Sequence, residues 1–219
     1  MSEPSPYGPK AVRTYRAIID PLLWRLRPRV VALCRELGVG HVLDIATATG
    51  AQCRALGRVG IEATGLDLSE EMIAAARRAG GRNVRYVCGS AYDLPFPDGS
   101  FDAALLLLAL HEHTEDERSQ MVKEALRVVR SEGVLIVAEY TEPSRPRWHA
   151  PWQVIRFIEA KAGPDHAAGF LDFTARGCLT GLVERTGLEE TRRVRSHVGA
   201  IGIAALRPTR FQGSGQEPV

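Results

Sequence analysis

From residue 41 onward, apolar runs of strand length alternate with segments of helical periodicity. The runs of strand length are 41–46, 62–68, 84–89, 101–110 and 133–140. This alternation is typical of a parallel sheet covered by helices on both faces, and a continuously apolar run such as Ala103–Leu110 suits a strand at its buried centre. The pattern therefore predicts a doubly wound α/β fold.

Two of the intervening segments begin with residues that cap helices. Ser69 precedes two acidic residues, and that segment ends at Gly80 after two arginines, which is the charge order that favours a helix. Thr114 is followed three residues later by Glu117, the spacing of a capping box. We predict helices over 69–80 and 114–130.

The alternation is interrupted after Tyr140. Prolines and two tryptophans occupy the segment that follows, and another helix is predicted around 177–187. Beyond it, two short strands are separated only by His197–Gly199, which predicts a hairpin.

We expect a single domain over residues 1–210. Within it, residues 1–40 contain one or two amphipathic helices and residues 141–176 form a lid-like insert. Residues 211–219 have the polar, glycine-containing composition of a flexible tail.

Composition excludes several classes of function. The chain has 219 residues and a net charge of +2, so it has no overall charge that favours nucleic acid or an anionic membrane. The four cysteines are scattered without a CxxC pair, which indicates thiols in a reducing compartment and no metal site. A polar N-terminus and the absence of any long apolar run predict a cytoplasmic protein without a membrane span.

The stretch LDIATATG, residues 43–50, runs from the first predicted strand into a turn. Ligands of open parallel sheets bind beyond the carboxyl ends of the strands, and dinucleotide sites place GxGxxG there. Here Asp44 lies beside the turn, where it would repel a diphosphate and attract an amine or a sulfonium. Asp67 ends the second strand and can accept hydrogen bonds from both hydroxyls of a ribose. The two acids together predict an adenosine ligand without phosphates.

Four segments between residues 42 and 140 resemble one known family. They are VLDIATATG, GLDLSEEMIAAAR, CGSAYDLPFPDGSFDAALLLLALHE and EALRVVRSEGVLIVAEY. In order and spacing they are similar to class I S-adenosylmethionine-dependent methyltransferases of the group that includes ubiquinone and menaquinone C-methyltransferases. The resemblance implies a seven-stranded, mostly parallel sheet in the order 3-2-1-4-5-7-6 with an antiparallel last strand, flanked by helical lids.

The resemblance also implies a cofactor site for S-adenosyl-L-methionine. The loop after the first strand would face the methionine portion, Asp67 the ribose, and the residues after it the adenine, with the methyl group emerging near Leu108 to His111. The implied cofactor residues are Asp44, Ala46, Thr47, Ala48, Gly50, Asp67, Leu68, Met72, Ser90, Ala91 and Leu108.

Two positions depart from the family pattern. Ala48 stands where glycine is common, and alanine at a positive φ costs about 1 kcal/mol. Ser90 replaces an aspartate that meets the adenine, and the loss of its charge weakens the hydrogen bond. These departures motivate a second hypothesis, a cofactor-binding regulatory or scaffolding protein without catalysis. An NAD-dependent oxidoreductase is disfavoured by Asp44 and by the missing GxGxxG motif.

Methyl transfer depends mainly on alignment of the acceptor, and a base is needed only if the acceptor must lose a proton. The candidate bases follow the fourth and fifth strands and are His111, Tyr140 and His149. His111 is the first choice because a histidine pKa suits proton removal near neutrality, although a structural loop histidine is the alternative. His111, His113, His149 and His166 could gather round a metal, but an HxH pair on one loop without a fixed partner spacing is a weak signal, so no metal is predicted.

The insert holds Trp148, Trp152, Ile155 and Phe157 within ten residues. These side chains either line a pocket for a flat or apolar small-molecule acceptor or form the buried face of a helix. The arginines of 192–195 favour a solvated surface over nucleic acid binding because aromatic residues for base stacking are lacking. The sequence leaves open the acceptor atom and whether the chain is a monomer or a homodimer.

Overall fold

The computed structural model describes residues 9–142, 149–161 and 163–208. Trp148 and the predicted tail 211–219 therefore lie outside the described residues.

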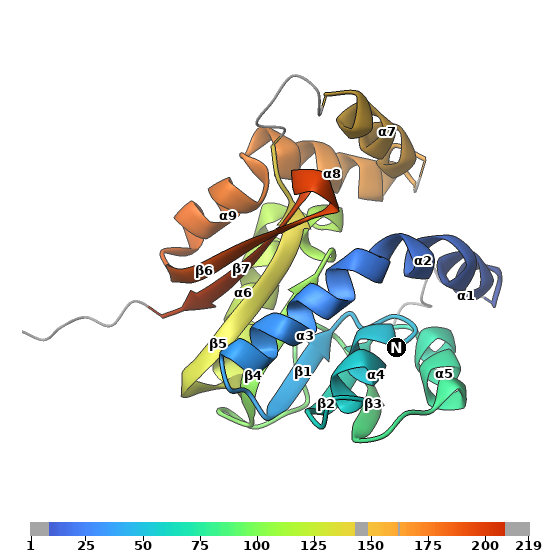
Figure 1. Cartoon of the computed structure of the whole chain (residues 1–219). Helices are drawn as coiled ribbons and strands as arrows, with labels where there is room; N and C mark the ends of the chain where they lie inside the picture. Colours follow the sequence, from blue (N-terminus) through green and yellow to red (C-terminus); the bar gives the residue numbers. More distant parts are fainter. Residues whose placement is uncertain (1–8, 143–148, 162, 209–219) are drawn as a thin grey trace, which may run out of the picture.

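A seven-stranded sheet forms the centre of the molecule, in the order β3-β2-β1-β4-β5-β7-β6 (Figure 1). Strands β1 to β5 are parallel to one another, and β7 runs antiparallel to both β5 and β6. This confirms the predicted order and the hairpin at His197–Gly199. The strands are β1 His41–Ile45, β2 Glu62–Asp67, β3 Val84–Cys88, β4 Phe101–Leu107, β5 Val129–Tyr140, β6 Glu189–Ser196 and β7 Ile201–Arg207.

Helices cover both faces of the sheet, and each face has its own hydrophobic core. One core joins α3, α4 and α5 to the sheet through residues such as Leu33, Leu56 and Ile73. The other joins α6, α8 and α9 through residues such as Met121 and Phe173. The helices are α1 Pro9–Thr14, α2 Asp20–Leu22, α3 Leu26–Glu36, α4 Ala51–Gly57, α5 Glu70–Ala79, α6 Glu115–Val128, α7 His149–Glu159, α8 Pro164–Ala175 and α9 Cys178–Thr186.

The predicted caps are present. The Ser69 hydroxyl accepts a hydrogen bond from the Met72 amide, and Thr114 and Glu117 form the reciprocal bonds of a capping box. The predicted helix at 114–130 ends instead at Val128, and β5 begins at the next residue. The chain passes from helix to strand there without a separate loop.

Strand β4 is shorter than the apolar run predicted. It ends at Leu107 because Leu108 has a φ of 55°, which no strand residue adopts. The chain then turns into the 3-10 helix η3, Leu110–Glu112. His111 therefore lies in η3, just beyond the carboxyl end of β4.

Helix α8 packs against η3 at this edge. Gly169 lies in the contact, where an added Cβ would be 2.5 Å from the carbonyl oxygen of Glu112. Figure 1 shows α7 and α8 above the upper end of β5. In the part of the chain that the structure describes, no helix combines the length and apolar character needed to cross a membrane.

Candidate active site

The loop after β1 has a backbone that glycine would favour. Three alternate residues have positive φ angles: Ala46 at 57°, Ala48 at 49° and Gly50 at 71°. The two alanines therefore hold left-handed conformations that L-residues adopt at a cost. Gly50 cannot be replaced similarly because an added Cβ would be 2.4 Å from the ring of Tyr86. The alanines thus keep the geometry of a glycine-rich turn.

Both predicted carboxylates lie at this loop. Asp67 accepts a hydrogen bond from the amide of Ala48 at 2.8 Å and another from the amide of Ser69 at 2.9 Å. Asp44 is 2% exposed and accepts a hydrogen bond from the Thr47 hydroxyl. The end of β2 is thereby fixed to the loop that follows β1. The two acids lie on the same side of the molecule, as a shared ligand requires.

His111 occupies the end of β4 and is buried. Its Nδ1 lies 2.9 Å from Oε2 of Glu139, and its Nε2 lies 3.6 Å from Oε2 of Glu159. The other oxygen of Glu139 accepts the amide of Leu110 at 2.7 Å. Burial lowers the pKa of His111, but the adjacent carboxylates, Glu139 above all, outweigh it and raise this pKa to about 10. At neutral pH the ring therefore carries a proton on both nitrogens.

Tyr140 contributes to an aromatic cluster above the strand ends. Its ring lies 4.9 Å from His111, 6.0 Å from Trp152 and 5.6 Å from Phe170, measured between centroids. Its hydroxyl donates to Oε1 of Glu159 at 2.6 Å, and burial raises its pKa. Tyr140 thus retains its proton in this structure. His149 begins α7, and its side chain lies outside the described residues.

Comparison with known proteins bears on this arrangement. Residues 43–137 match the model of a family described as a methyltransferase domain. A demethylmenaquinone methyltransferase of Tropheryma whipplei is 37% identical over 192 residues, which cover 80% of this chain and 79% of that protein. The chain belongs to the class I S-adenosylmethionine-dependent methyltransferases.

Solved structures agree with this methyltransferase fold. A SAM-dependent methyltransferase from Aquifex aeolicus superposes with a TM-score of 0.64 at 20% identity, covering 91% of this chain and 98% of that one. A magnesium protoporphyrin IX methyltransferase from Synechocystis PCC 6803, solved with bound SAH, superposes with a TM-score of 0.60 at 16% identity. The superposition covers 83% of this chain and 82% of the Synechocystis chain.

The electrostatics of the loop suit the cofactor of this methyltransferase, S-adenosyl-L-methionine. Among the residues that the structure describes, none forms an ion pair with Asp44 or Asp67. Burial raises the pKa of Asp44 to about 6 and also raises the pKa of Asp67. Buried carboxylates without a cationic partner favour a ligand that brings positive charge. The amine and sulfonium of the cofactor meet that requirement.

The N-terminal helices cover part of this loop, in the place expected of an N-terminal helical lid. Met72, one of the predicted adenine contacts, is buried in a cluster with Val12, Ala48 and Ala75. The Thr49 hydroxyl donates to a carboxylate oxygen of Asp20 at 2.7 Å. The segment around α1 and α2 thus forms one wall of the candidate cofactor site.

The remaining predicted cofactor residues lie around the same sheet edge in different environments. Leu68 is 54% exposed, which leaves its side chain free to pack on a ligand. The Ser90 hydroxyl accepts the amide of Tyr92 at 3.1 Å, and Ala91 is packed against the core. Leu108 is partly buried and has a positive φ. Their contact with the cofactor stays a prediction.

Sequence reasoning missed Glu159 and Arg118, which shape the strand ends, and named His166 only among the histidines that could gather round a metal. Glu159 and His166 face His111 from α7 and α8. Arg118 is fully buried, and its guanidinium donates to the carbonyls of Leu110 and Gly169. A buried arginine on the apolar side of a helix was the available signal, since such a charge needs several partners.

Proposed function

We propose that this methyltransferase transfers the methyl group of S-adenosylmethionine to an apolar, quinone-class ring in its reduced form. The observation that carries the proposal is the aromatic cluster of Tyr140, Trp152 and Phe170 beside His111, at the strand end from which the methyl group should emerge. Flat rings pack favourably against such edges and faces. The relatives named demethylmenaquinone methyltransferase support the same class of acceptor.

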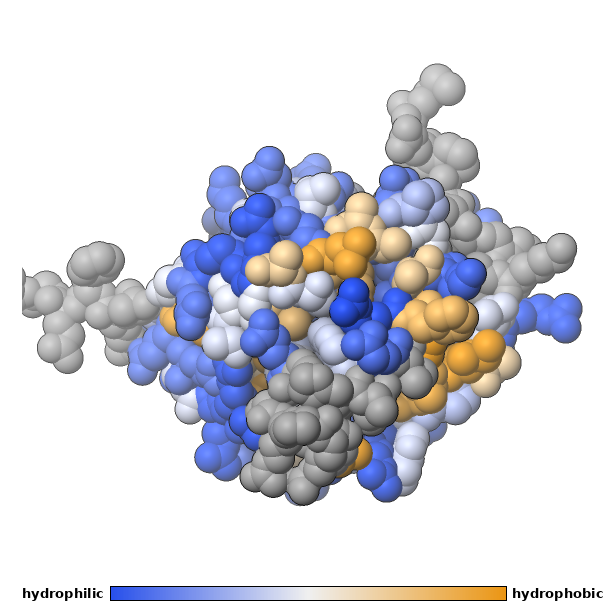
Figure 2. Space-filling view, turned by 90° about the horizontal axis from the view of Figure 1, so that it is seen from above, coloured by the Kyte–Doolittle hydropathy of each residue, from blue (hydrophilic) through white to orange (hydrophobic). Residues whose placement is uncertain are grey.

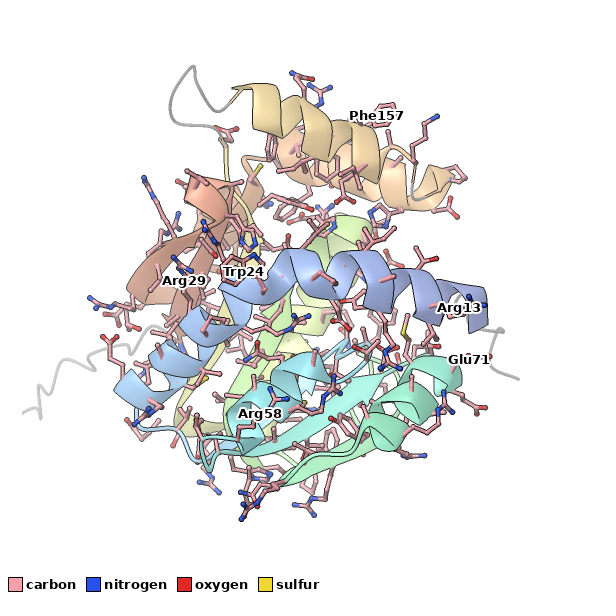
Figure 3. The ribbon with its side chains drawn as sticks, turned by 45° about the vertical axis from the view of Figure 1, so that its right-hand side comes forward. Arg13, Trp24, Arg29, Arg58, Glu71 and Phe157 are labelled. Atoms are coloured by element: carbon pink, nitrogen blue, oxygen red, sulfur yellow. The ribbon has the colours of Figure 1, made fainter. Side chains whose placement is uncertain are left out.

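The surface around this end also suits an apolar acceptor. Figure 2 shows hydrophobic residues gathered on the face seen from above. Trp24 and Phe157, labelled in Figure 3, are 63% and 66% exposed. Exposed apolar side chains of this kind can contact an apolar substituent of the acceptor.

Alignment would do most of the catalytic work. The bound cofactor supplies an electrophilic methyl group, and displacement of the sulfide needs only an acceptor atom held in line. Asp44 and Asp67 hold the donor, and the aromatic cluster orients the acceptor ring. Removal of a ring hydroxyl proton would increase the electron density of the acceptor.

A base role for His111 stays a prediction, and it requires that Nε2 be free of a proton. The pKa of His111 is raised by Glu139, so the ring accepts a substrate proton only after Nε2 has lost its own. The alternative of a regulatory protein without catalysis would leave cofactor binding intact and give no turnover.

Transfer of a labelled methyl group from S-adenosylmethionine tests the proposal. A reduced naphthoquinone with an apolar side chain should be methylated, and a small polar catechol should react far more slowly. Equal rates for both acceptors would contradict the proposed class of acceptor. Cofactor binding with no methylation of any acceptor would favour the regulatory alternative.

A further inference from the structure

Two imidazoles and a carboxylate converge where α7 and α8 meet the end of β4. His111 comes from η3, Glu159 is the last residue of α7, and His166 lies in the first turn of α8. Each offers one ligand atom, and these atoms lie within 4.8 Å of one another. His111 and Glu159 are buried, and His166 is half-buried. Two parts of the chain, η3 and the junction of α7 with α8, thus bring ligand atoms to one place.

Both imidazoles present their Nε2 atoms to Glu159. Nε2 of His111 lies 3.6 Å from Oε2 of Glu159, and Nε2 of His166 contacts the same oxygen. Each Nδ1 faces another carboxylate: Glu139 at 2.9 Å for His111, and Glu112 at 3.6 Å for His166. In metal sites a histidine ligand commonly donates its second N–H to a carboxylate, which fixes the tautomer and aims the other nitrogen at the ion.

Further hydrogen bonds fix the carboxylates of Glu159 and Glu139. Oε1 of Glu159 accepts the Tyr140 hydroxyl at 2.6 Å, and Oε1 of Glu139 accepts the Leu110 amide at 2.7 Å. Supported outer groups of this kind keep ligands in place.

The two rings lie close enough to share one ion. Their centroids are 5.5 Å apart, and both Nε2 atoms face Oε2 of Glu159. A cation bound there would displace the protons from both Nε2 atoms and keep Oε2 of Glu159 paired.

We infer that His111, Glu159 and His166 bind one divalent transition-metal ion. Two histidines and a glutamate are a ligand set that zinc accepts, and three protein ligands leave a position open for water or for an oxygen of the acceptor. Nε2 of His111 then binds the metal and does not accept a substrate proton. The inference goes beyond the proposed function and does not depend on the identity of the acceptor.

Zinc binding to the untagged, full-length chain tests this inference without any cofactor. After dialysis against a chelator, the protein is titrated with zinc sulfate in competition with a chromogenic chelator. One zinc ion per chain is expected, and His166→Gln and Glu159→Gln should each weaken binding at least about 100-fold. His113→Gln is the matched control, because His113 lies close in the same loop but its Nδ1 contacts the Tyr92 hydroxyl at 2.8 Å. This control should bind zinc like the wild type.

A cobalt spectrum gives a second readout that needs no variant. Cobalt(II) bound by the wild-type chain in a site of low coordination number should absorb much more strongly in the visible range than the hydrated ion. Absence of stoichiometric zinc binding by the wild type would overturn the inference. Unchanged affinity in folded His166→Gln, or a cobalt spectrum equal to that of the hydrated ion, would do the same.

Discussion

Replacing Ala46 by glycine should stabilise the protein, although glycine usually destabilises. Ala46 has a φ of 57°, and an L-residue in this conformation costs about 1 to 2 kcal/mol. Glycine removes that cost but gives the unfolded chain more freedom, which costs about 0.4 to 1 kcal/mol. Ala46 is also partly buried against the core, so loss of its methyl group offsets part of this gain, and the expected net gain is about 0.5 kcal/mol in the free energy of unfolding. Thermal unfolding should show a rise of about 2 °C in Tm for a chain of this size.

Two further variants separate this effect from other consequences of glycine. Ala48 has a φ of 49°, but its methyl group is buried in the cluster with Val12 and Met72. The loss of this buried methyl costs about 0.8 kcal/mol, so Ala48→Gly should leave stability nearly unchanged. Ala74 lies within α5, and Ala74→Gly should destabilise by about 1 kcal/mol. If Ala46→Gly destabilises as much as Ala74→Gly, the argument from backbone strain is wrong.

Three further predictions concern charged groups. Burial raises the pKa of Asp44 from 3.8 to about 6. The stability that Asp44 contributes to the cofactor-free protein is therefore present below pH 4 and is lost as the pH rises through 6. In urea unfolding curves, Asp44→Asn should flatten this pH dependence. The ionised form binds the cofactor, so calorimetry should show affinity falling below pH 6, and a pH-independent affinity would contradict this role. Arg118→Met should lower the free energy of unfolding by about 3 kcal/mol because it leaves buried hydrogen-bond partners unpaired. Its control, Arg176→Met, removes an exposed partner of Asp172 and should cost under about 1 kcal/mol. Equal losses in chemical denaturation would refute this distinction. His111→Ala should reduce turnover about 100-fold or more with cofactor affinity nearly unchanged, whether Nε2 moves a proton or binds the inferred metal. Loss of both turnover and cofactor affinity would indicate a structural residue.

Much of the fold was predictable because the signals for its strands and helices are local in the sequence. Apolar runs and capping residues such as Ser69 and Thr114 act within a few residues of the chain, and the structure confirms both caps. The end of β4 was placed wrongly, because Leu108 continues an apolar run and only its φ of 55° shows the turn. The residue type gave no sign of that conformation.

The candidate site was only partly predictable for a related reason. Asp44 and Asp67 lie at the carboxyl ends of two neighbouring strands, so the topology alone brings them together. The approach of Glu159 and His166 to His111 depends on how α7 and α8 pack. These helices follow a segment without a clear pattern, and no spacing along the chain encodes their position.

Calorimetric titration of S-adenosylmethionine into the wild-type protein and into Asp67→Asn tests the central claim most directly. The claim is that the carboxylates of Asp44 and Asp67, at the carboxyl ends of β1 and β2, recognise the cofactor. One binding site is expected for the wild type, with affinity at least about 10-fold weaker in the variant because the ribose then meets one acceptor oxygen instead of two. No detectable binding by the wild type at millimolar cofactor, or equal affinity for a folded variant, would contradict the account.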